Sequence, residues 1–163
     1  MNTQLQIKTE ENVRACAFTG HREIDEHFSV EKLNIQIETL IKNGVDTFYN
    51  GGAVGFDLIA AKQILAFKEK YPHIKLVVCV PYYGQEKYYA QEEKKAYANV
   101  CKNADEVVVL SEHYYKGCNL ARDRYMADRA DVLIAYLKKT SGGTAYTVSY
   151  FQKKYKNKEI IYI

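Results

Sequence analysis

The stretch that decides the fold is YNGGAVGFDLIAAKQIL, residues 49–65. The apolar residues 45–49 predict a strand, and residues 56–70 place apolar side chains three and four positions apart, which predicts a helix. Glycine permits positive φ and a close approach to the backbone. The junction is therefore either an ordinary tight turn or the edge of a ligand site. Its three glycines and its acid are Gly51, Gly52, Gly55 and Asp57.

The same alternation of strand and helix continues along the chain in both directions. Short apolar runs separated by helical patterns predict β-α-β units, a parallel sheet, and helices on both of its faces. We therefore expect an α/β three-layer sandwich with a mostly parallel sheet of about six strands. The expected strands are residues 13–18, 45–49, 74–80, 106–110, 131–137 and 159–163, and the expected helices are residues 29–43, 56–70, 85–103, 119–129 and 142–156.

Length and composition point to one globular domain. The chain has 163 residues, of which 47% are hydrophobic and 26% charged, values typical of a chain that forms a core. We expect residues 1–12 to be a polar N-terminal extension and residues 13–163 a single domain. The sequence has no apolar run of about 18 residues, so we expect no membrane span. The extension lacks the apolar segment of a secretory signal.

The cysteines and the net charge exclude two further classes of protein. The four cysteines are scattered without a CxxC pair, which argues against a zinc site and indicates a reducing, cytoplasmic location. Acidic residues are too dispersed to suggest another metal site. The net charge of +3 is much weaker than the basic footprint of a dedicated nucleic-acid binder.

Chemistry-bearing residues follow the first predicted strand. Ligands of open parallel sheets bind at the carboxyl ends of the strands. The motif TGHR, residues 19–22, occupies such an end. Gly20 permits a tight turn there, and His21 and Arg22 follow it. The fork of Arg22 suits a phosphate or a carboxylate. The alternative is a turn with two solvated polar side chains.

Two glycine junctions are candidate anion sites. Free N–H groups and the helix dipole favour an anion at the start of a helix. The junction before residue 56 matches neither GxGxxG nor GxxxxGK[ST], and its Asp57 suits either the dipole or a ribose hydroxyl. The second junction is TSGGT, residues 140–144, with Gly142, Gly143 and Thr144. Each junction also has a purely structural interpretation. The junction before residue 56 would be an ordinary turn, and in the second junction Ser141 or Thr144 would cap the last helix.

Two further segments supply candidate ligand-binding residues. In PYYGQEKYY, residues 81–89, Tyr82 and Tyr83 are candidates for stacking on a base, although packing of the loop on its own helix is the alternative. Asn119 and Arg122 lie near the start of the helix at residues 119–129, and hence near the sheet edge. The remaining charges of that helix suit a solvated face.

Five motifs together resemble the SLOG superfamily and, within it, the YpsA-like branch. They are TGHR, NGGAVGFDLIAA, VPYYGQEKYY, RDRYMADRADVLIAY and SGGT, in that order, over about residues 14–163. The resemblance implies a Rossmann-like fold that binds a nucleotide or a nucleotide-derived ligand. The superfamily also includes the LOG enzymes, called lysine-decarboxylase-like, and the DNA-processing protein DprA.

The match to the LOG enzymes is incomplete. Gly51, Gly52, Gly55 and Asp57 match a GG-x-x-G-x-D element of DprA-like and YpsA-like chains. Arg122 resembles the arginine of the LOG M-x-x-R-K helix, but Asp123 replaces the lysine. Gly142, Gly143 and Thr144 resemble the tail of the P-G-G-x-G-T loop, without its proline. The LOG glutamate would fall near residues 145–147, where no acid stands; Asp57 and Glu86 are candidates to replace it.

The resemblance and the residues together favour a binding protein over an enzyme. Arg22, Arg122, Thr144 and the two helix starts would hold phosphate, Asp57 would bind a sugar hydroxyl, and Tyr82 or Tyr83 would stack on a base. The alternatives are a LOG-like phosphoribohydrolase acting on a nucleoside monophosphate, with catalytic residues unassigned, and DprA-like binding of single-stranded nucleic acid, against which the modest charge argues. We expect no cofactor besides the nucleotide-like ligand, no metal and no membrane partner. The resemblance to LOG-type proteins implies a homodimer.

Overall fold

The computed structural model describes residues 14–163, so the predicted N-terminal extension lies outside the described residues. Six strands form one sheet in the order β4-β3-β2-β1-β5-β6, and every adjacent pair is parallel. The predicted sheet is thus confirmed, and it is parallel throughout. The strands are β1 (Arg14–Gly20), β2 (Val45–Asn50), β3 (Lys75–Val80), β4 (Glu106–Val109), β5 (Val132–Tyr136) and β6 (Glu159–Tyr162).

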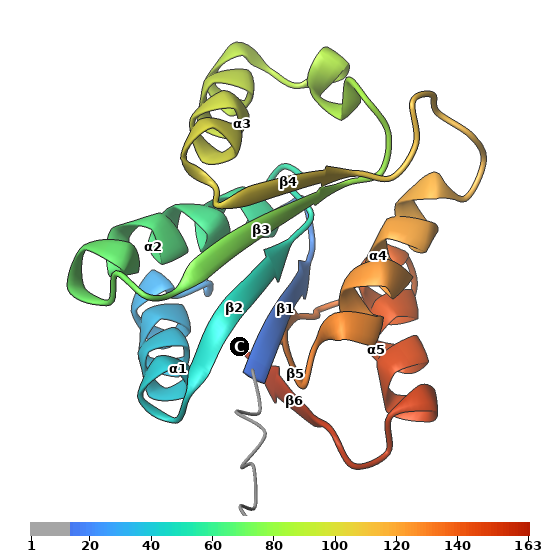
Figure 1. Cartoon of the computed structure of the whole chain (residues 1–163). Helices are drawn as coiled ribbons and strands as arrows, with labels where there is room; N and C mark the ends of the chain where they lie inside the picture. The colour runs from blue at the N-terminus through green and yellow to red at the C-terminus, as the bar shows by residue number, and fades with distance from the viewer. Residues whose placement is uncertain (1–13) are drawn as a thin grey trace, which may run out of the picture.

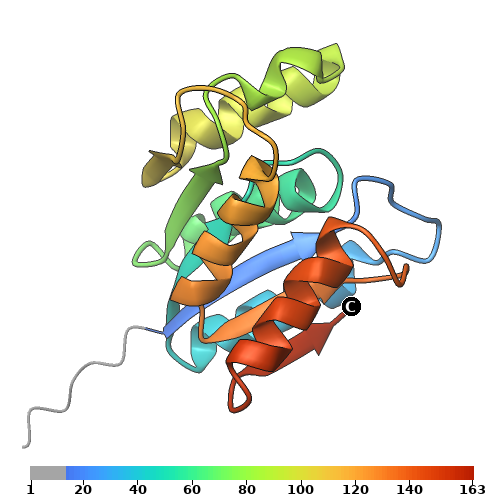
Figure 2. The ribbon, with the colours of Figure 1, turned by 90° about the vertical axis from the view of Figure 1, so that its right-hand side faces the viewer.

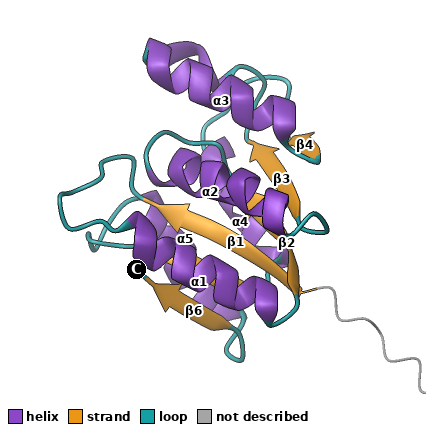
Figure 3. Ribbon diagram, turned by 90° about the vertical axis from the view of Figure 1, so that its left-hand side faces the viewer, coloured by secondary structure: helices purple, strands orange, loops and turns teal. Residues whose placement is uncertain are grey.

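Helices cover both faces of the sheet, which confirms the three layers (Figure 1). On one face lie α1 (Val30–Lys42), α2 (Phe56–Lys70) and α3 (Gln91–Asn103), seen in front of the sheet in Figure 3. On the other face lie α4 (Cys118–Arg129) and α5 (Gly143–Lys154), which pack side by side in Figure 2. Among residues 14–163, no helix is long and apolar enough to cross a membrane.

Helix α1 shows why the sequence pattern predicts the helices well. Its N-cap is Ser29, whose hydroxyl accepts a hydrogen bond from the Lys32 N–H at 3.2 Å. The chain turns beyond its end at Gly44, where φ is +99°. Between the two, the apolar side chains form a stripe that is buried against the sheet: Leu33, Ile37, Leu40 and Ile41.

The core has two parts because successive side chains of a strand point to opposite faces of the sheet. On β1, Cys16 and Phe18 enter the core under α1 and α2, whereas Ala17 enters the core under α4 and α5. Both sets are almost wholly buried. Continuous apolar runs such as residues 76–80 are therefore explained by burial on both faces.

The predicted helix at residues 85–103 is wrong in one respect, because the chain is broken near its start. Residues Gln85–Tyr88 form a short 3₁₀ turn, Tyr89 is extended, and α3 begins at Gln91. The Gln85 side chain donates to the Gly51 carbonyl at 3.1 Å, and the Tyr89 hydroxyl donates to the Gly52 carbonyl at 3.1 Å. Contacts with a distant loop thus fix this turn, and local helix propensity did not predict them.

Candidate functional site

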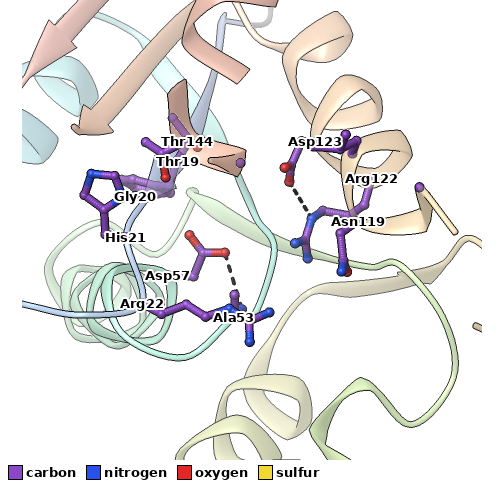
Figure 4. Close-up of a pocket in the computed structure, with 14 residues that line it drawn as sticks. Thr19, Gly20, His21, Arg22, Ala53, Asp57, Asn119, Arg122, Asp123 and Thr144 are labelled. Carbon is purple, nitrogen blue, oxygen red and sulfur yellow. Dashed lines mark hydrogen bonds and ion pairs between the residues drawn. The ribbon is translucent and has the colours of Figure 1, made fainter. Parts of the chain in front are cut away.

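A cleft of about 470 Å³ opens at the carboxyl edge of the sheet. Its walls come from the loop after β1, the junction after β2, the start of α4 and the start of α5 (Figure 4). The adjacent strands β1 and β5 lead to helices on opposite faces of the sheet, and such a switch point is where open parallel sheets leave a crevice. Its lining includes Thr19, Arg22, Ala53, Asp57, Asn119, Arg122, Asp123, Gly143 and Thr144.

The junction after β2 is held by its own polar side chains. Asn50 is fully buried, accepts the Gly52 N–H at 2.8 Å and donates to the Asp57 carbonyl at 2.8 Å. The Ala53 N–H donates to Asp57 Oδ2 at 3.3 Å. These bonds fold the loop back on the first turn of α2 and place the carboxyl of Asp57 in the wall of the cleft.

Two of the candidate glycines make room for protein. A Cβ on Gly20 would lie 2.3 Å from the ring of Phe56, which is fully buried. A Cβ on Gly55, where φ is +80°, would lie 2.2 Å from the Arg22 carbonyl oxygen. The Phe56 N–H donates to the His21 carbonyl at 3.1 Å. The loop after β1 and the junction after β2 are therefore packed against each other, and the glycines permit that contact.

Arg122 is buried and its guanidinium is engaged by the protein. Its Nη1 donates to the Gly51 carbonyl at 2.7 Å, and its Nε donates to Asp123 Oδ1 at 2.7 Å. A Cβ on Gly51 would lie 2.7 Å from both Arg122 Nη1 and Asp57 Oδ2. Arg122 thus lines the cleft and also ties α4 to the junction after β2, a role that its position in the sequence did not reveal.

Asp57 is the buried acid of the cleft. Only 6% of the residue is exposed. Removal from water raises the pKa of its carboxyl to about 7, and Asp123 acts in the same direction. Arg122, the Ala53 N–H and Arg22 lower the pKa by smaller amounts. Near neutral pH the carboxyl therefore exists in both protonation states.

Two hydroxyls in the cleft have no hydrogen-bond partner in the described part of the chain. Thr19 and Thr144 are each 6% exposed, and neither hydroxyl forms a hydrogen bond to any residue within 14–163. Both line the same cleft as Asp57, and Figure 4 shows the two threonines together above the acid. The second carboxyl oxygen of Asp57 likewise has no bond to the described residues. These three atoms are open to the cleft and are not occupied by the described part of the protein, so they are available to hydrogen-bond a ligand.

The start of α5 is open to the cleft. Its N-cap is Gly142, at φ +98°, and no side chain caps the helix. The alternative that Ser141 or Thr144 caps α5 is therefore wrong. The first N–H groups of a helix have no partner within it, and Gly143 and Thr144 line the cleft. This end can accept an anion.

His21 and Arg22 differ in how freely they can reach a ligand. The His21 Nε2 accepts the Lys138 N–H at 2.8 Å, and burial together with Lys139 lowers the pKa of the ring. His21 is therefore a neutral link between the loops after β1 and β5. Arg22 is exposed, and its guanidinium forms no ion pair or hydrogen bond with the part of the chain that the structure describes.

The predicted stacking tyrosines lie beside the cleft rather than inside it. Tyr82 lines an adjoining groove of about 190 Å³, which shares Arg22 and Asn119 with the cleft. Tyr83 lies farther away, in a cavity of about 670 Å³ that also contains Glu86. Of the two acids considered as replacements for the LOG glutamate, Asp57 lines the cleft and Glu86 does not.

Sequence reasoning missed Thr19 and Asp123 as cleft residues. Thr19 is the polar residue at the end of the apolar strand β1, and that position was its signal. Asp123 was noted only as a departure from a lysine, although it neutralises the buried Arg122. Gly52 lies outside the cleft, and a Cβ there would meet the Tyr97 ring at 2.9 Å. Within the described range, no group of three or more His, Cys, Asp or Glu residues is placed to hold a metal ion.

Comparison with protein families gives a match over almost the whole chain. The model named YpsA, described as the "YspA SLOG family", matches residues 16–163. A UPF0398 protein of Halalkalibacterium halodurans is 30% identical over 122 residues, which are 73% of this chain and 65% of that protein. The SPbeta prophage-derived protein YoqJ of Bacillus subtilis is 28% identical over 138 residues, 77% of this chain and 81% of that protein. This chain thus spans less than two thirds of the first relative.

Comparison with solved structures shows the same fold in two DNA processing proteins. DNA processing protein A of Helicobacter pylori, described for its single-stranded DNA binding mode, has a TM-score of 0.64 and 24% identity, and the match covers 92% of this chain and 65% of that one. DprA of Streptococcus pneumoniae has a TM-score of 0.65 and 18% identity, over 93% and 50%. At these identities the likeness concerns the fold alone.

Proposed function

Since the chain belongs to the YspA SLOG family, we propose that its cleft binds a nucleotide or a nucleotide-derived ligand. One observation carries this proposal: the Thr19 and Thr144 hydroxyls and the Oδ1 of Asp57 belong to residues that line one cleft, and none of these three atoms has a hydrogen bond to a residue within 14–163. Hydroxyls, a carboxyl and the charged side chains around them in one concave site suit a small polar ligand.

The phosphate end of the ligand fits the open start of α5. The amides around Gly143 and Thr144 attract an anion, and the Thr144 hydroxyl adds a hydrogen bond. Arg22 lies on the same cleft with its guanidinium free of described partners, and its fork suits two phosphate oxygens. Arg122 stabilises the junction after β2, because its guanidinium donates to the Gly51 carbonyl.

The remainder of the ligand fits the groove beside the cleft. A sugar hydroxyl would hydrogen-bond to Asp57, and a base would lie toward Tyr82, since cleft and groove share Arg22 and Asn119. The homodimer and the cytoplasmic location implied by the sequence stay predictions.

Calorimetric titration with nucleoside mono-, di- and triphosphates and with dinucleotides tests the proposal. Arg22→Ala should weaken binding about ten- to a hundredfold, because a charge-assisted hydrogen bond contributes roughly 1.5–3 kcal/mol. The control is Arg124→Ala, which removes an arginine of α4 that is bound to the Tyr146 hydroxyl outside the cleft. Equal loss in both variants, or no binding by the wild type, would contradict the proposal.

Single-stranded nucleic acid is a second candidate ligand, favoured by the exposed tyrosines beside the groove. Tyr83, Tyr88 and Tyr114 are 78%, 86% and 63% exposed and line one cavity, and stacking aromatics are the usual platform for single strands. Oligonucleotide affinity should then fall steeply with salt and fall again in Tyr83→Ala. If oligonucleotide affinity changes neither with the salt concentration nor in Tyr83→Ala, the small ligand is the better candidate.

A further inference from the structure

We propose that Asp57 makes the cleft select its ligand by protonation: with the carboxyl protonated the cleft accepts an anion, and with it ionised the cleft favours a neutral hydroxyl-bearing group. This inference rests on the proposed binding function and assigns the regulation of that same site. It concerns what the cleft binds at a given pH, not whether it binds.

The carboxyl of Asp57 lies inside the cleft that is proposed to bind an anion. Asp57 lies in the wall that the start of α5 and Arg22 also line. Its Oδ2 is held by the Ala53 N–H at 3.3 Å, which leaves the other oxygen for a ligand. An ionised carboxylate can only accept hydrogen bonds, whereas the protonated acid can donate one to a phosphate oxygen. The same atom therefore recognises opposite chemistries in its two states.

The charges that face Asp57 do not hold it ionised. From α4 come Arg122 and Asp123, which neutralise each other through a 2.7 Å ion pair. Arg22 approaches from the loop after β1 but is exposed, so solvent weakens its effect. The neutral side chains Cys79 and Tyr89 also lie near Asp57, and the ring of His21 accepts the Lys138 N–H through its Nε2.

Burial consequently decides the titration, and it raises the pKa of Asp57 to about 7. Below this pH the acid is protonated and an anion enters without repulsion. Above it, a bound dianion would lie beside a buried carboxylate, which low local dielectric makes costly. Anion affinity should fall as pH rises through about 7, and anion binding near that pH should take up a proton.

Sulfate is the best probe because it stays a dianion throughout the range, so that any pH dependence comes from the protein. Calorimetric affinity for sulfate should fall about thirtyfold between pH 6.0 and pH 8.5 in the wild type, as expected for one linked proton. Asp57→Asn cannot ionise and should show a flat profile. The matched control is Glu112→Gln. Glu112 is an exposed acid that lines the cavity of Tyr83 and lies outside the cleft, so this variant should keep the wild-type profile.

A carboxyl ¹³C NMR titration of the unliganded wild type supplies a second readout that needs no variant. An ionisation of Asp57 below pH 5, or a wild-type sulfate profile in Asp57→Asn, would overturn the inference while nucleotide binding could stand. Absence of binding for sulfate and for every nucleotide at all pH values would overturn the proposed function, and the inference with it.

Discussion

The junctions before α2 and before α5 look alike in sequence but differ in structure. Both place glycines between a strand and a helix, in NGGAVGFD and TSGGTA. In the first, Gly51 faces Arg122 and Asp57, and Gly55 faces the Arg22 backbone, all at distances under 3 Å from an added Cβ. In the second, a Cβ on Gly142 would meet nothing within 4 Å.

The junction before α2 is packed by the protein itself, whereas the junction before α5 is open to the cleft. Before α2, the amides of Gly52, Ala53 and Phe56 already donate to protein oxygens. Before α5, the amides of Gly143 and Thr144 and the Thr144 hydroxyl have no hydrogen bond to a residue within 14–163. Glycine thus makes room for the protein at one junction and leaves space for a ligand at the other.

The largest effect should come from Gly55→Ala. Strain at φ +80° and overlap with the Arg22 carbonyl should together cost on the order of 3–5 kcal/mol of unfolding free energy. The matched variant Gly142→Ala keeps a strained φ but has open space, so it should cost only about 1–3 kcal/mol. Urea unfolding measures both. Equal costs would show that the first junction is not packed as described.

A pH-dependent effect is expected for Asp57→Asn. The folded-state pKa of about 7 lies above the ordinary value of 3.8, so the unfolded state releases this proton at lower pH and wild-type stability falls as pH rises from about 4 to 7. The asparagine variant escapes this loss. Its unfolding free energy relative to the wild type should rise by about 2–3 kcal/mol between pH 5 and pH 8.

Urea melts of the two proteins at several pH values check this. A constant difference across that range would mean that Asp57 is ionised throughout, and would place the carboxyl in a more polar setting than the structure shows.

The smallest effect on stability is expected for Thr144→Val. Its hydroxyl has no partner within residues 14–163, so stability should change by no more than about 0.5 kcal/mol, while ligand affinity should fall. The control Thr147→Val, one turn later, loses a hydroxyl that donates to the Gly143 carbonyl at 2.8 Å. That variant should cost about 0.5–1.5 kcal/mol and leave affinity nearly unchanged. The opposite ranking in thermal melts would assign Thr144 to the scaffold.

Several features of the site were accessible from the sequence because they follow from strand ends. Parallel strands bring their carboxyl ends to one edge, so the motifs after β1, β2 and β5 were predicted to meet, and they line one cleft. Whether each polar side chain is bound by the protein or free to meet a ligand could not be predicted in this way. Arg122 and Arg22 are equally charged in the sequence, yet one is tied to Gly51 and Asp123 while the other is exposed.

The sequence by itself determined the alternation of elements, the parallel sheet and the places where the chain turns, because period, caps and glycines act over a few residues. Only the tertiary structure decided which glycine junction is filled, where residues 85–103 break and which acid is buried. Those outcomes depend on contacts between residues far apart in the chain, such as Gln85 with Gly51 and Arg122 with Gly51. A polar group's partner, and therefore its availability to a ligand, is fixed only when the chain has folded.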